Sequence, residues 1–412
     1  MKSEVFKTNR ENLLNNIEEN SAAVFFAGIA PKKTGDEAYL FTPDRNFYYL
    51  TGVDEQDIIL LLVKGKEETK QILFIKKPDL ELEKWIGKSI RAGEAKEKGA
   101  FRQIKYIEDF EDTLHGVLFK DGIERLYLDL ERDRFSQRLT QEEEFAKEIK
   151  DKYPDKIIKN SYSLVSELRM IKSPEEIENI RKAIKITIDG VNELMKNSKA
   201  GMKEFELEAY FHFHCKRSGT KDLAFKTIAA SGINATVLHY ADNDSEIKDG
   251  DLVLFDLGAQ YEYYNADITR TFPVNGKFTD RQKQVYEAVL RVNKKVIEEL
   301  KPGINFKEIN NKATEMIAEE CIKLGLIKDA EEVRKYYWHS IGHSLGLDTH
   351  DVGKRETLLK PGMIYTVEPG IYIEEEGIGI RIEDDVLITE KGYEVLTKDM
   401  IKEIEEIEKF MK

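Results

Sequence analysis

Two stretches of this sequence repeat one short pattern that places a carboxylate next to a glycine-bearing turn. Residues 248–258 and 360–370 match at a constant offset of 112 residues, and each reads as a turn, an apolar strand, an acid and a glycine. The acid is Asp256 in the first stretch and Glu368 in the second. Burying an acid at the end of an apolar strand is costly unless a positive charge pairs with it. The repeat therefore predicts a positive partner for both carboxylates.

A second acid follows each stretch, and a histidine precedes each. The acids are Asp267 and Glu383, and the histidines are His239 and His350. Two turn acids that flank a hairpin are the plain alternative, because Asp favours turns. Four acids from two related halves, with histidines nearby, instead favour a shared metal site where the halves meet.

A histidine-rich segment adds to the candidate ligands. The chain has seven histidines, and three of them lie within twelve residues that also contain glycines: His339, His343 and His350. A lone histidine is usually structural, but three beside glycines that permit close backbone approach favour at least one ligand. Asp384 and Asp385 follow Glu383 directly, and both stay open as alternative ligands. An exposed edge strand with an Arg381–Glu383 pair is the alternative to a buried site.

Four carboxylates and one imidazole form a hard, oxygen-rich ligand set. Such a set suits Mn²⁺, Fe²⁺, Co²⁺ or Zn²⁺ in a two-metal site and is unlike a thiolate site for structural zinc. Two divalent cations held about 3.5–4 Å apart can lower the pKa of a shared water and polarise a carbonyl group. The residues alone therefore predict a dinuclear metallohydrolase.

The elements that must position these residues fall into two parts. Residues 1–155 alternate between strand-like runs and helical patterns, which favours an α/β domain with a mainly parallel sheet covered by helices. The runs are 22–27, 58–63, 71–75 and 125–130, and the helical patterns include 108–119 and 133–150. A linking segment, 156–172, is expected to follow.

The second part, residues 173–412, contains the repeat. Ser173-Pro174-Glu175-Glu176 predicts a helix start, because Ser caps the helix, Pro occupies its first position and Glu176 completes a capping box. Each half then reads as a helix, a break at Gly201 or Gly303, another helix and the acid-bearing hairpin. This order predicts a pseudo-two-fold α+β domain.

Bulk composition narrows the class of protein. A chain of 412 residues with 41% hydrophobic and 34% charged residues is typical of a soluble globular protein of two or three domains. The net charge of −14 argues against nucleic-acid binding, and the longest aliphatic run, 58–63, is too short to span a membrane. Cys215 and Cys321 lack metal-site spacing, so we expect buried reduced thiols and a cytoplasmic location.

The motifs resemble those of the pita-bread metallopeptidases, specifically the Xaa-Pro aminopeptidase (aminopeptidase P) branch with its creatinase-like N-terminal domain. The resemblance spans nearly the whole chain. The residues that carry it are 238–240, 251–258, 266–276, 342–350, 367–370, 377–385 and, in the N-terminal part, Arg45 to Gly52. It implies hydrolysis of the bond before a proline in second position, a tertiary amide that offers no N–H.

The resemblance also implies a role for each metal ligand. Asp256 would bind one cation with both oxygens, and Asp267 and Glu383 would bridge two cations. His343 and Glu368 would bind the other cation. The cations are expected to be Mn²⁺, with Co²⁺, Zn²⁺ or Fe²⁺ as alternatives.

The same resemblance implies roles around the substrate. Glu368 would also act as the acid/base that takes the proton of the water. His239 and His350 would hydrogen-bond the substrate near the scissile carbonyl. Arg381 would hold the ligands in place from the face of Glu383, and His339 would be structural support.

Several alternatives stay open within and outside this family. A prolidase shares the five ligands but cuts only dipeptides, and hydrolysis of a small amidine by a creatinase-type enzyme is a further candidate. The long N-terminal part disfavours a methionine aminopeptidase, and the intact ligands disfavour a non-catalytic binding protein. The family implies a homodimer or homotetramer, in which Trp85 resembles a position that reaches across an interface; a place in the local core is the alternative.

Overall fold

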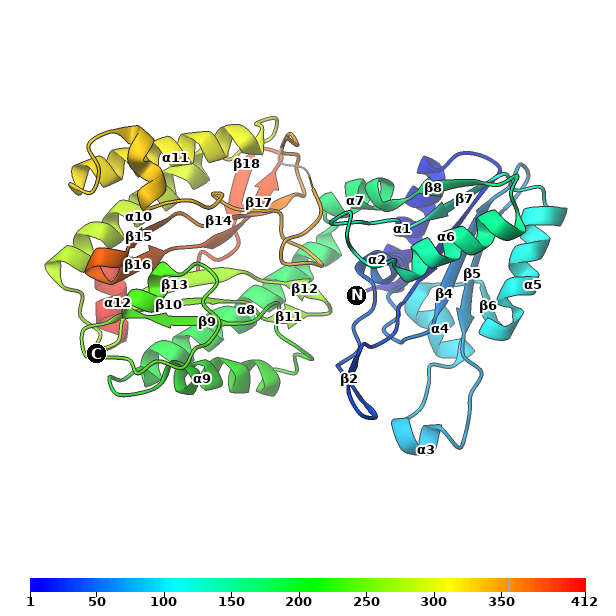
Figure 1. Ribbon diagram of the computed structural model, residues 1–412, viewed down its shortest axis with the longest axis horizontal. Coiled ribbons are helices and arrows are strands. Elements are labelled where there is room, and N and C mark those ends of the chain that lie inside the picture. The colour runs from blue at the N-terminus through cyan, green and yellow to red at the C-terminus, as the bar shows by residue number, and fades with distance from the viewer. Residues whose placement is uncertain (354–355) are drawn as a thin grey trace. The chain divides into compact units, whose positions relative to one another are not determined.

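The computed structural model describes residues 1–353 and 356–412, which form two compact units, Met1–Arg169 and Met170–Lys412 (Figure 1). The boundary falls inside the segment expected as a linker, and this segment carries regular structure. Strand β8 (Ile157–Asn160) pairs with the sheet of the first unit, and helix α7 (Tyr162–Met170) follows it. Asn160 accounts for the turn between them, because its Oδ1 accepts hydrogen bonds from the backbone N–H groups of Leu130 and Tyr162.

The first unit is built on a six-stranded sheet in the order β6-β5-β4-β1-β7-β8. Strand β4 is antiparallel to both of its neighbours, and the other pairings are parallel, so five strands run in one direction. The mainly parallel sheet expected from the sequence is therefore confirmed. Its remaining strands are β1 (Ser21–Phe26), β4 (Ile59–Lys64), β5 (Thr69–Ile75), β6 (Gln103–Tyr106) and β7 (Arg125–Leu128).

Helices cover this sheet and bury an aliphatic and aromatic core that includes Val24, Leu61, Phe74 and Leu126. The helices are α1 (Ser3–Asn16), α2 (Arg45–Thr51), α4 (Ala92–Gly99), α5 (Phe110–His115) and α6 (Gln141–Lys152), and short elements complete the unit: β2 (Lys32–Thr34), β3 (Glu37–Ala38) and α3 (Glu83–Ile86).

Helix α6 starts later than the sequence pattern indicated. The expected helix over 133–150 begins only at Gln141, where Thr140 and Glu143 form a capping box. The residues before it are held in a loop by the Arg132 side chain, which donates to the backbone carbonyls of Arg134, Phe135 and Gln137. These local bonds replace the first helical turns.

The second unit repeats one arrangement twice, as the sequence predicted. Each half contributes two long helices and antiparallel strands. The first half has helices α8 (Pro174–Asn197) and α9 (Glu204–Arg217) and strands β9 (Ile228–Ser231), β10 (Leu252–Leu257) and β13 (Ile268–Pro273). The second half has helices α10 (Asp280–Glu299) and α11 (Phe306–Lys323) and strands β14 (Ile364–Val367), β15 (Gly370–Ile373), β16 (Ile378–Arg381) and β17 (Asp384–Thr389). The short strands β11 (Gln260–Tyr261), β12 (Tyr264–Asn265) and β18 (Gly392–Val395) and helix α12 (Ile404–Phe410) complete it.

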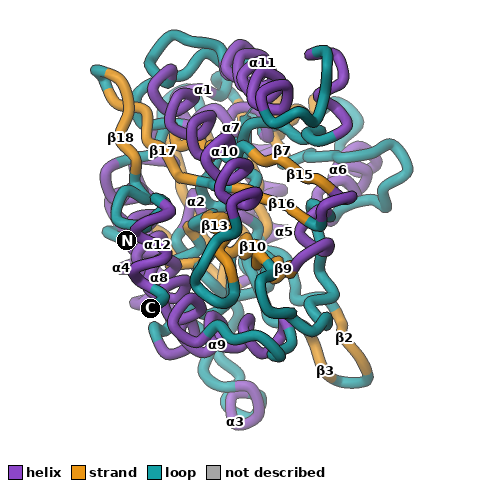
Figure 2. Tube along the Cα trace, turned by 90° about the vertical axis from the view of Figure 1, so that its left-hand side faces the viewer, coloured by secondary structure: helices purple, strands orange, loops and turns teal. Residues whose placement is uncertain are grey.

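Within this unit the strands of both halves form a layer between the two helix pairs. Helices α8 and α9 lie on one side of the strands, and α10 and α11 lie on the other (Figures 1 and 2). One cysteine lies on the second helix of each half, Cys215 on α9 and Cys321 on α11, and both are unpaired and buried. The helix predicted at Ser173 forms with its capping box and runs on to Asn197.

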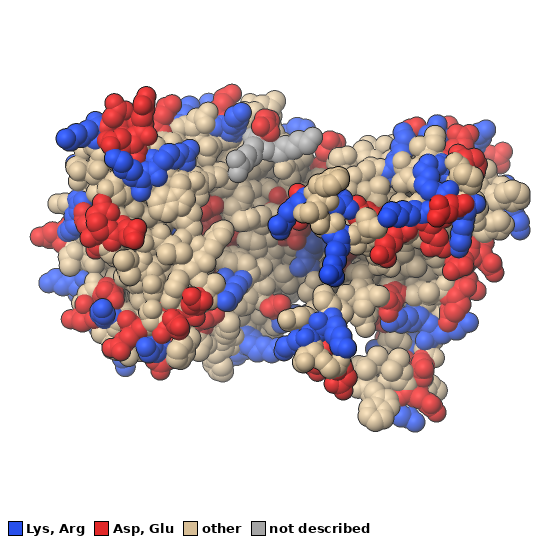
Figure 3. Space-filling view, in the orientation of Figure 1, with Lys and Arg blue, Asp and Glu red and all other residues tan. Residues whose placement is uncertain are grey.

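On the face shown in Figure 3, Lys and Arg are interspersed with Asp and Glu rather than gathered in one stripe. Among the residues that the structure describes, no helix combines the length and the apolar character needed to cross a membrane.

Candidate metal centre

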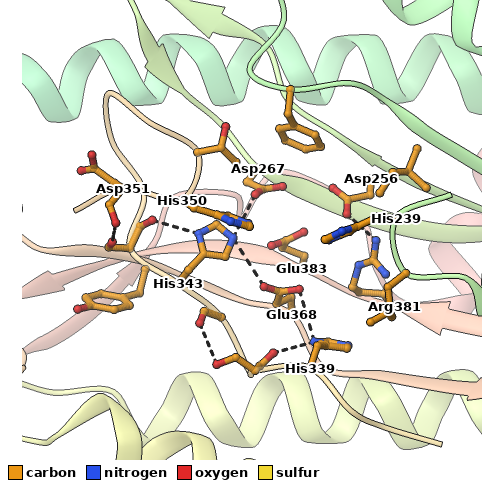
Figure 4. A pocket seen from close by; sticks show the side chains of 18 of the residues that line it. His239, Asp256, Asp267, His339, His343, His350, Asp351, Glu368, Arg381 and Glu383 are labelled. Atoms are coloured by element: carbon orange, nitrogen blue, oxygen red, sulfur yellow. Dashed lines mark hydrogen bonds and ion pairs between the residues drawn. The ribbon is translucent and has the colours of Figure 1, made fainter. Parts of the chain in front are cut away.

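A cavity of about 680 Å³ opens in the second unit between the strands of the two halves. Its lining brings together the five predicted ligands and the histidines and arginine predicted beside them, and Figure 4 shows their side chains converging. These residues are His239, Asp256, Asp267, His343, His350, Glu368, Arg381 and Glu383, with His339 beside them.

In the first half, a close backbone approach brings the two acids together. Asp256 lies near the end of β10, opposite Thr269 of β13, and Asp267 directly precedes β13. Between them the chain turns back so tightly that a Cβ on Gly258 would lie 1.9 Å from the carbonyl oxygen of Ala266. Only glycine permits this approach, which explains Gly258, whereas Gly370, its counterpart in the second stretch, lies against the side chain of Tyr372.

In the second half, the acids follow β14 and β16. Glu368 comes after β14 and Glu383 stands between β16 and β17. Thr269 of the first half joins Glu383 to the site, because its Oγ1 donates to Glu383 Oε2 at 2.7 Å and its carbonyl oxygen accepts the Glu383 N–H at 3.1 Å. The two halves are therefore linked at the acid itself.

His343 presents one ring nitrogen to the acids. Its Nε2 lies 3.4 Å from Asp267 Oδ2 and 3.7 Å from Glu368 Oε1. Its Nδ1 lies 3.0 Å from the carbonyl oxygen of Ser344, which can only accept, so Nδ1 carries the proton. Burial and the neighbouring His350 lower the pKa of His343 to about 4, which leaves the ring neutral. A neutral imidazole with a free Nε2 lone pair is the form that binds metals.

The carboxylates are short of positive charge and of hydrogen-bond donors. Burial and then the charge of Glu383 raise the pKa of Asp267 and of Glu368 well above the usual range, and burial and Asp256 raise the pKa of Glu383 to about 8. In the described part of the chain, the buried Oδ1 atoms of Asp256 and Asp267 have no hydrogen-bond partner. Such oxygens are costly unless a cation satisfies them.

The geometry fits the predicted cations. Asp267, His343 and Glu383 each offer one ligand atom, and these three atoms all lie within 4.8 Å of one another. Asp256 and Glu368 flank this group in the same cavity (Figure 4). Carboxylate oxygens with one neutral imidazole are the donors that divalent cations such as Mn²⁺ and Zn²⁺ accept.

Arg381 and two neighbours that the sequence analysis missed support these ligands. Arg381 forms an ion pair with Asp256 Oδ2, and its Nε donates to Thr269 Oγ1 at 3.1 Å. Its Nη1 donates to the hydroxyl of Tyr372 at 3.0 Å, and this hydroxyl lies 2.8 Å from Nε2 of His339. Thr269 could have been found, because it lies two residues after Asp267 and so shares its side of the strand. Tyr372 leaves no such signal.

Asp384 is paired away from the cavity, and Asp385 holds the backbone of Asp267. Asp384 Oδ1 accepts from Arg270 at 2.8 Å and from Thr397 at 2.7 Å, while its Oδ2 pairs with Lys402 at 2.6 Å. Asp385 Oδ2 accepts the backbone N–H of Asp267 at 3.2 Å, and neither aspartate lines the cavity.

The alternative of an exposed edge strand is wrong. Arg381 and Glu383 are 3% and 1% exposed, so both side chains lie in the interior, and the ion pair of Arg381 is with Asp256. The regular strand that carries Arg381 ends at that residue, and the next one begins only at Asp384. The irregular step between them turns Glu383 toward the cavity (Figure 4).

The other two histidines that line the cavity, His350 and His239, lie beside the ligands. His350 packs against His343 with ring centroids 4.2 Å apart, and burial and the nearby His239 lower its pKa. His239 lies near Asp256 and Arg381 on an exposed loop (Figure 4).

Comparison with known proteins agrees with this geometry. Residues 178–390 match the family model described as metallopeptidase family M24, and residues 6–127 match the aminopeptidase P N-terminal domain. The chain belongs to metallopeptidase family M24. A Xaa-Pro aminopeptidase of Haemophilus influenzae is 36% identical, over 99% of this chain and 97% of that protein.

Two solved structures share the fold of this M24 chain from end to end. A Bacillus anthracis protein provisionally assigned as an aminopeptidase P has a TM-score of 0.98 at 50% identity, covering 100% of this chain and 98% of its own. Escherichia coli aminopeptidase P with the inhibitor Pro-Leu has a TM-score of 0.92 at 33% identity, with the same coverage. The predicted combination of an α/β N-terminal domain and a pita-bread C-terminal domain is confirmed.

Proposed function

We propose that this M24 chain is a metal-dependent Xaa-Pro aminopeptidase, which releases the first residue of peptides that have proline in second position. The observation that carries the proposal is the gathering of all the predicted ligands in one cavity of a chain that matches Xaa-Pro aminopeptidases over its whole length. The N-terminal unit supports it too, because it matches the aminopeptidase P N-terminal domain.

Two divalent cations would be held by five side chains. Asp256 would bind one cation, His343 and Glu368 the other, and Asp267 and Glu383 would bridge them. We propose Mn²⁺ as the cation, with Co²⁺, Zn²⁺ or Fe²⁺ as alternatives. When bound, the cations would supply Lewis acidity toward the scissile carbonyl and a water of lowered pKa.

Glu368 would move the proton. Its carboxylate lines the cavity beside His343, and a carboxylate within reach of the water can act first as general base and then as general acid. It would take the proton of the attacking water and pass it to the proline nitrogen, which has no proton of its own.

His239 and His350 would bind the carbonyl oxygen of the substrate and stabilise the charge that develops on it. Donors aimed at the carbonyl suit this bond, because a peptidase that relied on the amide N–H would lose that contact at proline. Arg381 would keep Asp256 and, through Thr269, Glu383 in place.

An exposed apolar segment of the N-terminal unit supports assembly into a homodimer or homotetramer. Around α3, the exposed fractions are 71% for Leu80, 87% for Trp85 and 71% for Ile86. The alternative that Trp85 belongs to the local core is therefore wrong. Clustered exposed apolar side chains mark interaction surfaces. We also propose a cytoplasmic location, which the two buried, unpaired thiols support.

Cleavage of matched peptides tests the function. The protein loaded with Mn²⁺ should release the first residue of a Xaa-Pro-Xaa tripeptide at a rate at least comparable with a Xaa-Pro dipeptide. It should cut the tripeptide with Ala in place of Pro far more slowly. Turnover of the dipeptide without cleavage of the tripeptide would make the protein a prolidase, and no turnover with any of the four cations would make it a binding protein.

A further inference from the structure

His239 owes its position to the loop that carries it. The side chain is exposed, and within the described residues its imidazole makes no hydrogen bond. The loop runs from the short 3₁₀ helix η3 (Gly232–Thr236) to β10. Backbone hydrogen bonds of Ser245 and Ile247 join its later part to residues 201–204, but those next to His239 are local: Val237 N–H donates to the Asn234 carbonyl and Tyr240 N–H to the Val237 carbonyl. Such a loop needs another anchor if His239 is to meet a substrate at one fixed point.

Glu204, the first residue of α9, is that anchor. Its side chain is fully buried, and its carboxylate accepts five hydrogen bonds from residues 231–245. At Oε1 the donors are Ser231 N at 2.7 Å, Ser231 Oγ at 2.7 Å and Asn234 Nδ2 at 3.0 Å, and at Oε2 they are Tyr240 OH at 2.8 Å and Ser245 N at 3.0 Å. These donors span the loop on both sides of His239.

The chemistry of the anchor requires a carboxylate. Among the described residues no Lys or Arg forms an ion pair with Glu204, so the five donors and the N-terminus of the fourteen-residue helix α9 compensate its buried charge. An amide of the same shape has one acceptor oxygen and one NH₂ group. With the oxygen kept at Oε1, the NH₂ group would face the N–H of Ser245, and both of these groups are donors.

A second clamp strengthens the same loop. Asn243 has φ +50, and its Oδ1 accepts the N–H of Ala229 at 3.1 Å. Its Nδ2 donates to the carbonyl of Thr227 at 2.9 Å and to Glu208 Oε2 at 3.0 Å. Asn243 therefore ties the middle of the loop to β9, while Glu204 binds residues on both sides of it.

We propose that Glu204 is a positioning residue for His239: it holds the loop so that this imidazole meets the carbonyl oxygen of the substrate. Glu204 acts on His239 through Tyr240, which follows His239 in the chain and whose hydroxyl donates a hydrogen bond to Glu204. The proposal rests on the proposed function, because it assigns Glu204 to the reaction that His239 serves.

Hydrogen exchange of the metal-free protein tests the anchoring without reference to activity. In Glu204→Gln the amides of 231–245 should exchange about tenfold faster or more, because the Ser245 N–H loses its acceptor, while the amides of α10 should be unchanged. Glu206→Gln is the matched control, since this exposed acid lies on the same helix and caps only Lys203. Unchanged exchange of 231–245 in Glu204→Gln would overturn the proposal.

A double-mutant cycle then tests the link to His239. Glu204→Gln should lower kcat on a Xaa-Pro peptide by about 10–100-fold with unchanged metal content, and Glu206→Gln should leave it unchanged. In the His239→Ala background the same change should lower kcat by less than about twofold, because its route to the substrate is gone. An equal loss in both backgrounds would overturn the proposal.

Should Glu204→Gln fail to fold, Tyr240→Phe removes one donor and leaves the other four. Tyr240→Phe is expected to speed the exchange of 231–245 and to lower kcat, each by less than Glu204→Gln does. Full activity with unchanged exchange would overturn the proposal. If the wild-type protein cuts no Xaa-Pro peptide, the proposed function fails, while the exchange measurement still decides whether Glu204 anchors the loop.

Discussion

Loading the metal centre with divalent cations at pH 7 is expected to release protons, because the metal-free cluster holds them. Burial and Asp256 raise the pKa of Glu383 to about 8, so this carboxyl carries about 0.9 proton at pH 7. Burial and the charge of Glu383 also raise the pKa of Asp267 and of Glu368 well above the usual range, which adds to the protons held by the cluster. Ligand carboxylates must be ionised, which predicts the release of about one proton or more per chain.

The sign of the pH dependence follows from the same shifts. Since cations compete with protons, metal affinity should rise with pH, by about tenfold per pH unit for each proton released. His343 contributes nothing to this slope, because its pKa of about 4 already leaves it neutral at pH 7. The imidazole and the carboxylates therefore make separable contributions.

Titration calorimetry measures the number of protons. The protein is stripped with a chelator and titrated with Mn²⁺ at pH 7 in two buffers of different ionisation enthalpy, and the difference in binding enthalpy gives the protons released. Glu383→Gln should lower that number by about one, while His343→Ala should weaken binding and leave it unchanged. An enthalpy that is the same in both buffers would refute the reasoning.

Three further predictions follow from the site. In the metal-free protein the raised pKa of Glu383 contributes stability that is fully present below the pKa of this group in the unfolded chain, about 4.3, and is lost as pH rises toward 8. Urea midpoints should therefore fall over that pH range, and should fall less in Glu383→Gln. His350→Ala should lower kcat by about 10²–10³ with metal content intact by elemental analysis, and loss of metal would make His350 a ligand. Asp384→Asn should lower the free energy of unfolding by about 3–5 kcal/mol in urea, because it leaves Arg270 and Lys402 without their buried partner; a loss under about 1 kcal/mol would contradict this.

Asp256 and Glu368 could be predicted because they occupy the same place in a repeat, whereas His343 was indicated by a cluster of three histidines. Turn, apolar strand, acid and glycine recur together, and these features have local physical causes, such as the tight approach at Gly258. The strands were predictable for the same reason, since an apolar run of strand length ending at a turn needs no distant partner to be recognised.

Other features depend on residues far apart in the sequence. The five donors of Glu204 lie 27 to 41 positions away, and nothing near this acid distinguishes it from the exposed acids of the same helix. Asp384 is a candidate ligand by its place next to Glu383 in the sequence, but Arg270, 114 positions earlier, binds its carboxylate instead. The helix expected over 133–150 begins only at Gln141, because the Arg132 side chain binds backbone carbonyls of the residues before it. Such choices are made by tertiary contacts, which a local pattern does not contain.

Each half of the repeat contains one thiol, so alkylation of the two cysteines can measure the local opening of each half separately. Burial raises the pKa of Cys215 and of Cys321 to about 12, so the folded chain holds almost no thiolate at neutral pH. An alkylating reagent should therefore modify either cysteine only after its half has opened. Equal alkylation rates would mean that the two halves unfold as one cooperative unit, and unequal rates would show which half yields first.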